Sequence, residues 1–370
     1  MKVYAPCFFR DFHCIGSDCR DNCCRMGWDI EIDQATYDRY KTLGGGLCEH
    51  ITNENGEHYI MQRGGQCPFL NEQGLCSVLL EHGEDSISEI CTQHPRFYEW
   101  FGGYKEAGTG LCCEESARLW LESAGKISFC EWETEEPDDD LEFDGELLGA
   151  VLKARGVLIG LLQSGEMTLS QKLKALLIFG LNTQEFDESG AAEDFYALAQ
   201  EFEDIGNVKA LIGQLGEGSF EDRLSACEKV LEYFSGLDYM KGVLPAAAAQ
   251  IRGRLGDIIG AAKDFDKAFP QADGQLCAVA VYNVYRYFSH CARGAQCLPF
   301  IVTGILNVWF VRLWDILMWL DRKFDFRAQT DAVKEYSKEI EYSDNTAVLW
   351  EDVYTDSRLC AENLVKIAEV

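Results

Sequence analysis

Cysteine is concentrated at one end of this chain, and this distribution limits how that end can fold. Twelve of the 17 cysteines lie within residues 1–130, and the stretch CIGSDCRDNCCRMGW (14–28) alone contains four of them. A small region rich in loops and poor in apolar residues generally needs cross-links or a bound metal to stay folded. The N-terminal region therefore predicts a small module that is stapled through its thiols.

Metal ligation, rather than disulfide formation, is the expected use of these thiols. The N-terminal sequence MKVYAPCFFRDFHC lacks the apolar core and the cleavage site of a signal peptide, which predicts a cytoplasmic protein, where disulfides are rare. The number of cysteines is odd, and Cys23-Cys24 and Cys112-Cys113 are neighbours that could bond to each other only with strain. Three cysteines outside any motif are expected to be ordinary buried thiols: Cys7, Cys48 and Cys130.

Charge and hydropathy limit the partners. The chain has 33 Lys and Arg against 62 Asp and Glu, a net charge of −29, which repels nucleic acid and anionic membranes. Such acidity favours a basic, lysine-bearing partner, although it also serves solubility alone. The most apolar stretch, LPFIVTGILNVWFV (298–311), is shorter than the roughly 18 residues that indicate a bilayer span. We therefore expect a buried helix there, and neither a nucleic-acid nor a membrane partner.

The chain divides into two regions of different pattern, and the fold class predicted is mainly α. Residues 1–130 form the cysteine-rich metal-cluster module, the acidic run EWETEEPDDDLEFDGE (131–146) reads as a linker or loop, and residues 147–370 form an α-helical substrate-binding domain. In the module, WDIEID (28–33) alternates like a half-buried strand, and EHYIMQ (57–62) could be a second one.

Helix signals are clear in both regions. Asp33 is placed to cap a helix over QATYDRYKTL, which should stop at Gly44. The tetrapeptides TLSQ (168–171) and SFED (219–222) are capping-box patterns. Apolar residues at three- and four-residue steps predict helices at about 146–163, 192–204, 246–268, 275–291, 299–321, 327–341 and 346–368.

The cysteine spacing favours an iron–sulfur centre over zinc. If Ser17 caps a helical turn, Cys19 and Cys23 share one face and present two sulfurs to one centre. In CPFLNEQGLC, turns at Pro68 and Gly74 would bring the two terminal cysteines, at 67 and 76, together. No C-x2-C pair of the zinc type occurs, and irregular spacing with one local cluster suits iron–sulfur ligation better. Zinc stays the alternative metal.

These motifs resemble a known family. In order and spacing, CIGSDCRDNCCRMGWDIEID, CPFLNEQGLC, CTQHPRF and CCEESARL are similar to those of the flagellin lysine-N-methylase family. Near the other end, QTDAVKEYSKEIEYSDN (329–345) resembles the C-terminal signature of that family. Two positions depart from the family pattern, since Lys338 stands where Arg is usual and Tyr342 where His is usual.

The resemblance implies a protein-lysine N-methyltransferase that moves methyl groups from S-adenosylmethionine to lysine ε-amines of flagellin, or of another lysine-rich surface protein. It also implies an iron–sulfur cluster, [4Fe–4S] in type. The candidate ligands by motif are Cys14, Cys19, Cys23, Cys24, Cys67, Cys76, Cys91 and Cys112. Eight thiols exceed the four that one cluster takes. Either two centres exist, or some of these thiols only line the site.

Two routes to the methyl donor can be tested against the letters of the sequence. EAGTGLC (106–112) matches an acid-x-Gly-x-Gly nucleotide loop, but the preceding WFGGYK does not read as a buried strand, so we interpret it as a chance match. A radical-type C-x3-C-x2-C motif begins at Cys19 and Cys23 but lacks its third cysteine, because position 26 is Met26. A third thiol would have to come from Cys67 or Cys91.

The candidates for substrate chemistry are fewer. Glu339 and Glu341 are candidates for binding the substrate amine, and aromatic residues at 281–290 and 308–319 could line its slot, although aromatics at helical spacing are usually core. His94 is a candidate ligand or hydrogen-bonding group. The alternative function is a non-catalytic iron- or zinc-binding or redox module with a helical partner-binding domain.

Overall fold

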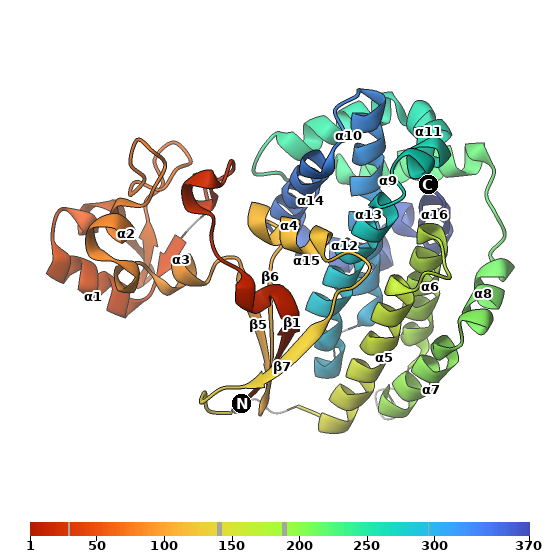
Figure 1. Cartoon of the computed structure of the whole chain (residues 1–370), viewed down its shortest axis with the longest axis horizontal. Coiled ribbons are helices and arrows are strands. Elements are labelled where there is room, and N and C mark those ends of the chain that lie inside the picture. Colours follow the sequence, from red (N-terminus) through yellow and green to blue (C-terminus); the bar gives the residue numbers. More distant parts are fainter. Residues whose placement is uncertain (29, 139–142, 187–190, 295) are drawn as a thin grey trace.

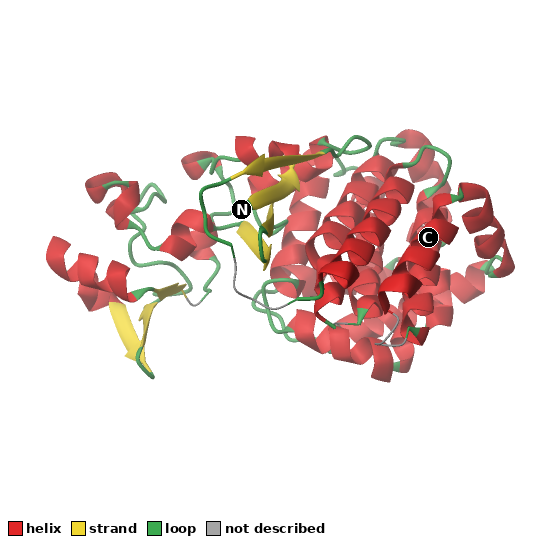
Figure 2. Ribbon diagram, turned by 90° about the horizontal axis from the view of Figure 1, so that it is seen from below, coloured by secondary structure: helices red, strands yellow, loops and turns green. Residues whose placement is uncertain are grey.

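The computed structural model describes residues 1–28, 30–138, 143–186, 191–294 and 296–370. It has a small lobe of short helices and strands, a large helical lobe, and a sheet where the two meet (Figures 1 and 2). Sixteen α-helices lie within the described residues, which confirms the mainly α class with a cysteine-rich strand-and-loop region ahead of a helical one.

The small lobe contains the two strands and the helix that the sequence predicted, plus a third strand and two short helices. Strands β2 (Ile30–Ile32), β4 (Glu57–Ile60) and β3 (Ile51–Glu54) form an antiparallel sheet in that order, and α1 (Gln34–Leu43), α2 (Ser77–His82) and α3 (Glu89–Gln93) surround it. Asp33 caps α1 as predicted, since its Oδ1 accepts the Thr36 N–H at 2.8 Å, and the helix ends at Gly44 with φ 72°. Among the described residues, five apolar side chains form its buried core: Ile32, Tyr40, Ile60, Phe69 and Val78.

A four-stranded sheet joins the lobes, and the sequence did not predict it. Its order is β5 (Arg96–Phe101), β6 (Tyr104–Thr109), β1 (Lys2–Pro6), β7 (Phe129–Glu133), with β1 parallel to β6 and antiparallel to β7. The acidic segment at 131–146 thus begins inside a strand. The sheet packs on the helical lobe, where the Tyr285 hydroxyl lies 2.8 Å from the Tyr4 carbonyl oxygen and 2.7 Å from that of Ala107.

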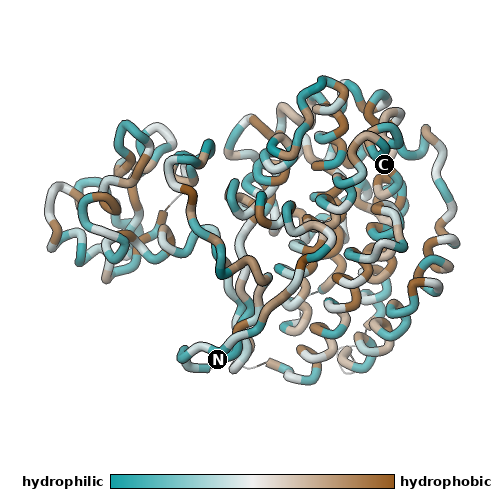
Figure 3. Tube along the Cα trace, viewed as in Figure 1, coloured by the Kyte–Doolittle hydropathy of each residue, from teal (hydrophilic) through white to brown (hydrophobic). Residues whose placement is uncertain are grey.

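The helical lobe has one continuous core that also takes in Phe101, Leu111 and Trp120, so the core extends across the boundary expected at residue 130. Hydrophobic segments recur along its helices (Figure 3). The helices are α4 (Glu114–Glu122), α5 (Gly145–Gln163), α6 (Leu169–Asn182), α7 (Ala191–Glu203), α8 (Ile205–Gln214), α9 (Phe220–Phe234), α10 (Val243–Gly253), α11 (Leu255–Ala268), α12 (Ala272–Tyr287), α13 (Cys297–Leu320), α14 (Phe326–Ile340), α15 (Asn345–Thr355) and α16 (Ala361–Ile367).

Most helix predictions are confirmed, and two are wrong in extent. Thr168 and Ser219 form the predicted capping boxes. The predicted helix 246–268 is two helices, because the backbone of Arg254 leaves the helical region (φ −130°, ψ 20°) while its guanidinium pairs with Asp321 at 2.6 Å. The predicted helix 346–368 is likewise split into α15 and α16, and α8 was missed.

Helix α13 lies at the centre of the lobe. Within the described residues it is the one helix long and apolar enough, by length and composition, to cross a membrane, and 94% of its most apolar window is buried inside the protein. The predicted buried helix at 298–311 is therefore confirmed.

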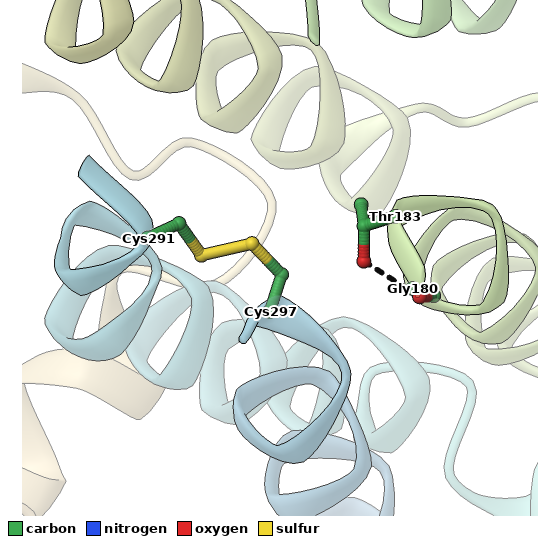
Figure 4. The surroundings of a disulfide bond; sticks show 4 residues. All are labelled: Gly180, Thr183, Cys291 and Cys297. Carbon is green, nitrogen blue, oxygen red and sulfur yellow. Dashed lines mark hydrogen bonds between the residues drawn. A yellow bond between two sulfur atoms is a disulfide. The ribbon is translucent and has the colours of Figure 1, made fainter. Parts of the chain in front are cut away.

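The expectation that the cysteines form no disulfides is wrong for four of them. Cys7 and Cys130 are bonded, with Cα atoms 4.9 Å apart, because the antiparallel pairing of β1 and β7 sets Ala5 opposite Cys130. Cys291 and Cys297 are bonded across the turn before α13 (Figure 4). Cys7 and Cys130 are thus not the free buried thiols that the sequence suggested.

Candidate functional site

A cavity of about 700 Å³ lies where the cysteine-rich lobe faces the helical lobe. Four of the eight candidate thiols line it: Cys23, Cys24, Cys67 and Cys91. The rest of its wall is mostly apolar and aromatic, with Trp28, His94 and three isoleucines from the small lobe, and Met240 and Tyr342 from the helical lobe. A concave, largely apolar chamber of this size with a few polar groups is typical of a small-molecule or cofactor site.

Hydrogen bonds to backbone groups hold the thiol-bearing loops together. The Asn22 side chain accepts the Cys24 N–H at 2.9 Å and donates to the Gly74 carbonyl at 2.8 Å. The Cys67 N–H donates to the Cys24 carbonyl oxygen at 2.8 Å. Gly74 turns with φ 76°, which suits glycine, and the chain then returns to pair Leu70 with Cys76. Loops 22–24 and 67–76 are therefore one hydrogen-bonded unit.

The thiols in the cavity influence one another. A hydrogen bond with Cys24 lowers the pKa of Cys23 to about 7, and the same bond holds the pKa of Cys24 well above its usual value. Burial, and then the neighbouring Cys91, Cys76 and Cys23, raise the pKa of Cys67 to about 11. Cys91 is accessible to solvent, but the protein packed around its thiol reduces hydration of the thiolate and so raises its pKa. Ligand binding by these sulfurs would therefore release protons.

The other four candidate thiols lie elsewhere. Cys14 is exposed, and Cys76 packs on the core of the small lobe. Cys112 is buried and hydrogen-bonded to the Tyr342 side chain. The Cys19 thiol donates a hydrogen bond to Glu114 at 3.8 Å. The predicted helical turn that joined Cys19 to Cys23 is wrong, since Cys19 is extended (φ −70°, ψ 121°) between two separate 3-10 turns.

The donor set fits a cluster better than a single ion. No three His, Cys, Asp or Glu side chains of the described residues converge as a single metal ion requires. Four thiols nevertheless face one chamber, which is the number and the ligand type that a [4Fe–4S] cluster takes at its corners. A cluster is wider than an ion, so its sulfur ligands need not meet at one point. The residues present fit the group.

Three aromatic rings form one wall of the cavity. The Trp28 ring stacks on Tyr342 with centroids 5.7 Å apart, and His94 lies 5.3 Å from Trp28 and edge-on to Tyr342. Trp28 Nε1, His94 Nε2 and the Gln62 amide oxygen are buried without a hydrogen-bond partner. All three residues line the cavity, so a bound group there could satisfy them. Of these, the sequence had indicated only His94.

His94 allows a test of how dry this wall is. Burial, and then the positive charge of Lys338, lower the pKa of His94 to about 4. Because an unfolded histidine titrates near about 6.5, the unfolded chain binds the extra proton first, and the free energy of unfolding falls as the pH drops from 6.5 to 4. Over that range metal-free wild type should lose about 3 kcal/mol more than His94→Gln, as measured by urea unfolding. Parallel pH profiles would contradict the buried, neutral ring.

Glu339 and Glu341 have structural partners, and neither lines the cavity. The Glu339 carboxylate accepts the backbone N–H groups of Met240 at 2.8 Å and Lys241 at 2.9 Å. Glu341 Oε2 accepts the hydroxyls of Tyr282 at 2.7 Å and Tyr287 at 2.8 Å. In this structure both carboxylates thus hold parts of the helical lobe in place.

The segment EAGTGLC (106–112) packs against aromatic side chains of the protein itself, so it leaves no room for a nucleotide. Contrary to the expectation from its flanking residues, it continues a buried strand, β6. A Cβ on Gly108 would collide with the Phe97 ring, and one on Gly110 would collide with the Tyr342 hydroxyl. These two glycines therefore admit aromatic rings, in agreement with a chance match to the nucleotide-loop pattern.

The fold and the site together define a two-lobed, mainly helical protein with a thiol-lined cavity between its cysteine-rich and helical lobes. The chain matches the model of the FliB lysine N-methylase C-terminal domain over residues 155–358. It belongs to this family.

Similar proteins agree with this assignment. The chain is 30% identical over 126 residues to the flagellar biosynthetic protein FliU of Salmonella muenchen, which covers 31% of this chain and 74% of that one. It is 32% identical, also over 126 residues, to the lysine-N-methylase of Salmonella typhimurium, and 30% identical to that of Salmonella choleraesuis. The aligned part spans 31% of each lysine-N-methylase. No solved structure matches the chain.

Proposed function

We propose that this protein is an iron–sulfur-containing methyltransferase that moves methyl groups from S-adenosylmethionine to lysine ε-amines of flagellin. The observation that carries the proposal is the cavity between the lobes, into which Cys23, Cys24, Cys67 and Cys91 project from three separate segments. Membership of the lysine N-methylase family supports the reaction type.

The four cavity thiols would hold the cluster. When bound, it would cross-link the loops of a lobe that has a small core of its own, and with one thiolate on each iron its part would be structural or in electron transfer. The protein would supply the rest of the environment. Trp28 and Tyr342 exclude water from one wall, and their ring faces suit a positively charged sulfonium.

The transfer itself is a displacement at the methyl carbon. The bond between this carbon and the donor sulfur breaks as a bond to the neutral lysine nitrogen forms, and the sulfur leaves with the bonding pair as a thioether. The lysine must therefore lose its ammonium proton to solvent or to a protein base. A water-poor chamber favours the neutral amine, because burial disfavours the charged form.

A second cavity supports a lysine-bearing substrate. It has a volume of about 630 Å³, adjoins the first at Ile90 and Gln93, and is lined by Glu31, Asp33, Glu89 and Glu136 with the rings of Tyr98 and Trp100. One lysine of the protein already uses these groups: Lys105 Nζ lies 4.4 Å from the Tyr98 ring centroid and 2.6 Å from Glu136. The negative charge of this second cavity complements a basic segment of flagellin or of another lysine-rich surface protein.

The test is a methylation assay. Anaerobically purified, iron-loaded protein is incubated with folded flagellin and S-adenosylmethionine, and tryptic peptides are weighed. We expect additions of one or more methyl groups on lysine-containing peptides. A colourless preparation with stoichiometric zinc and no sulfide would contradict the cluster. Iron-loaded protein that leaves flagellin unmodified would instead favour a non-catalytic metal-binding or redox role.

A further inference from the structure

We infer that helix α14 of the helical lobe acts as a clamp that positions Cys23 and Cys24 in the cavity, with Asp21 as the positioning residue. The inference rests on the proposed function only in treating this cavity as the active site. It gives the segment 329–345 a mechanical role, whereas its sequence had suggested residues that bind the substrate amine.

Two lysines of α14 converge on one carboxylate. Lys334 Nζ lies 3.0 Å from Asp21 Oδ2, and Lys338, one turn further along, pairs with the same oxygen. The two lysine side chains are only 4% and 1% exposed, so each has given up its hydration. A buried ammonium needs a paired anion, and Asp21 is the nearest carboxylate to both; Glu335 of α14 itself also lies 3.5 Å from each of them.

The neighbouring residue is held in the same direction. The Arg20 guanidinium makes two bonds to Asp331 of α14, at 2.7 and 2.9 Å, while its Nε donates to Glu114 of α4 at 2.8 Å. The backbone N–H of Arg20 also donates to Glu114, at 3.0 Å. Planar two-point bonding of this kind fixes orientation as well as distance.

The cysteine loop is anchored at its other end too. Lys241 Nζ donates to the Arg25 carbonyl oxygen at 2.9 Å, and Met26 is buried. Residues 20–26 are thus tied to the helical lobe on both sides of Cys23 and Cys24. Cys67 and Cys91 lie in segments without such a tie to α14 among the described contacts. The clamp should therefore act most directly on Cys23 and Cys24, to a smaller extent on Cys67, which is hydrogen-bonded to Cys24, and least on Cys91.

Tryptic cleavage separates these thiols well. Cleavage after Arg20 and Arg25 gives DNCCR, which contains Cys23 and Cys24 alone, and residues 42–63 contain Cys48 alone. Cys67, Cys76 and Cys91 share the peptide 64–96 and are told apart by its fragment ions. The full-length, metal-free, reduced protein is pulsed with iodoacetamide, and the labelled peptides are quantified by mass spectrometry. Alkylation rates measured in this way report local opening of the loop and do not require methyl transfer.

Asp21→Asn should raise the labelling rate of Cys23 and Cys24 roughly tenfold, since it removes a charge-assisted partner from two buried lysines. The rates of Cys91 and Cys48 should stay within about twofold of wild type, and that of Cys67 should rise less than that of Cys23 and Cys24. Lys338→Arg keeps the charge and should label like wild type. Asp38→Asn, the same change at an exposed pair with Lys41 in the same lobe, is the matched control.

Unchanged labelling of the peptide 21–25, which is NNCCR in Asp21→Asn, would overturn the inference, whatever the methylation assay shows. If that variant unfolds, buried Cys227 and Cys277 of the helical lobe will label as well, and Lys338→Gln then replaces it, because Lys334 still holds Asp21. Lys338→Gln should raise the rate for DNCCR by a smaller factor. Equal acceleration at Cys48 would mean general loosening of the lobe and would also refute the clamp.

Discussion

Cys67→Ser is expected to lose its bound iron, with iron per chain falling roughly tenfold or more, whereas Cys48→Ser should keep it. Even changes outside the ligand shell cost roughly 10–100-fold in metal affinity, and loss of a ligand should cost at least as much. Cys67 lines the cavity, and its backbone N–H is bonded to Cys24, so its sulfur is held among the other thiols. The change should also destabilise the small lobe, because ligand binding and folding are coupled.

Cys48 is the matched control for this experiment. It is in the same lobe, packs on the same small core, and is partly buried like Cys67, but it does not line the cavity. Cys76→Ser tests whether the sequence motif or the position in the cavity decides which thiols bind iron. Cys76 belongs to the same motif as Cys67 but packs on the core and does not line the cavity, so this variant should keep its iron. Iron and sulfide analysis of anaerobic preparations, together with the visible spectrum, gives the measurement. Iron lost from Cys48→Ser but retained in Cys67→Ser would refute the assignment of the site.

Local signals in the sequence predicted local structure well. Asp33 and Gly44 mark both ends of α1, and Thr168 and Ser219 begin their helices as capping boxes. Each of these signals acts within one turn of helix. The sheet between the lobes was missed for the opposite reason, since β1 pairs with residues about a hundred positions away. The disulfide between Cys7 and Cys130 depends on that pairing and was missed with it.

The site shows the same limit. Motifs identified eight candidate thiols, but which of them share a cavity depends on how the loops at 22–24, 67–76 and 91 pack, and spacing does not contain that information. The helical turn proposed for Cys19 and Cys23 failed because Arg20 and Asp21 bind the helical lobe and hold the chain extended there. The stacking of Trp28 on Tyr342 links positions more than 300 residues apart, so no local pattern could indicate it.

Arg155→Met should cost about 3–5 kcal/mol of unfolding free energy, because it leaves the Glu106 carboxylate buried without its cation. Arg155 of α5 and Glu106 of β6 are 3% and 1% exposed, and the guanidinium donates to both carboxylate oxygens, at 2.8 and 2.5 Å. This pair joins the sheet to the helical lobe. Urea unfolding followed by circular dichroism measures the change.

Lys153→Met, two residues earlier on the same helix, should change stability by about 0–1 kcal/mol, because its partner Glu203 and Lys153 itself are each about half exposed. Combining Arg155→Met with Glu106→Gln should recover much of the loss, since no buried charge is then left unpaired. The Tyr104 hydroxyl, which donates to Glu106 at 2.8 Å, can still bond the amide oxygen. If Arg155→Met costs no more than Lys153→Met, the pair does not hold the sheet against the helices. In that case the packing of Tyr285 against the Tyr4 and Ala107 carbonyls would be the stronger link between them.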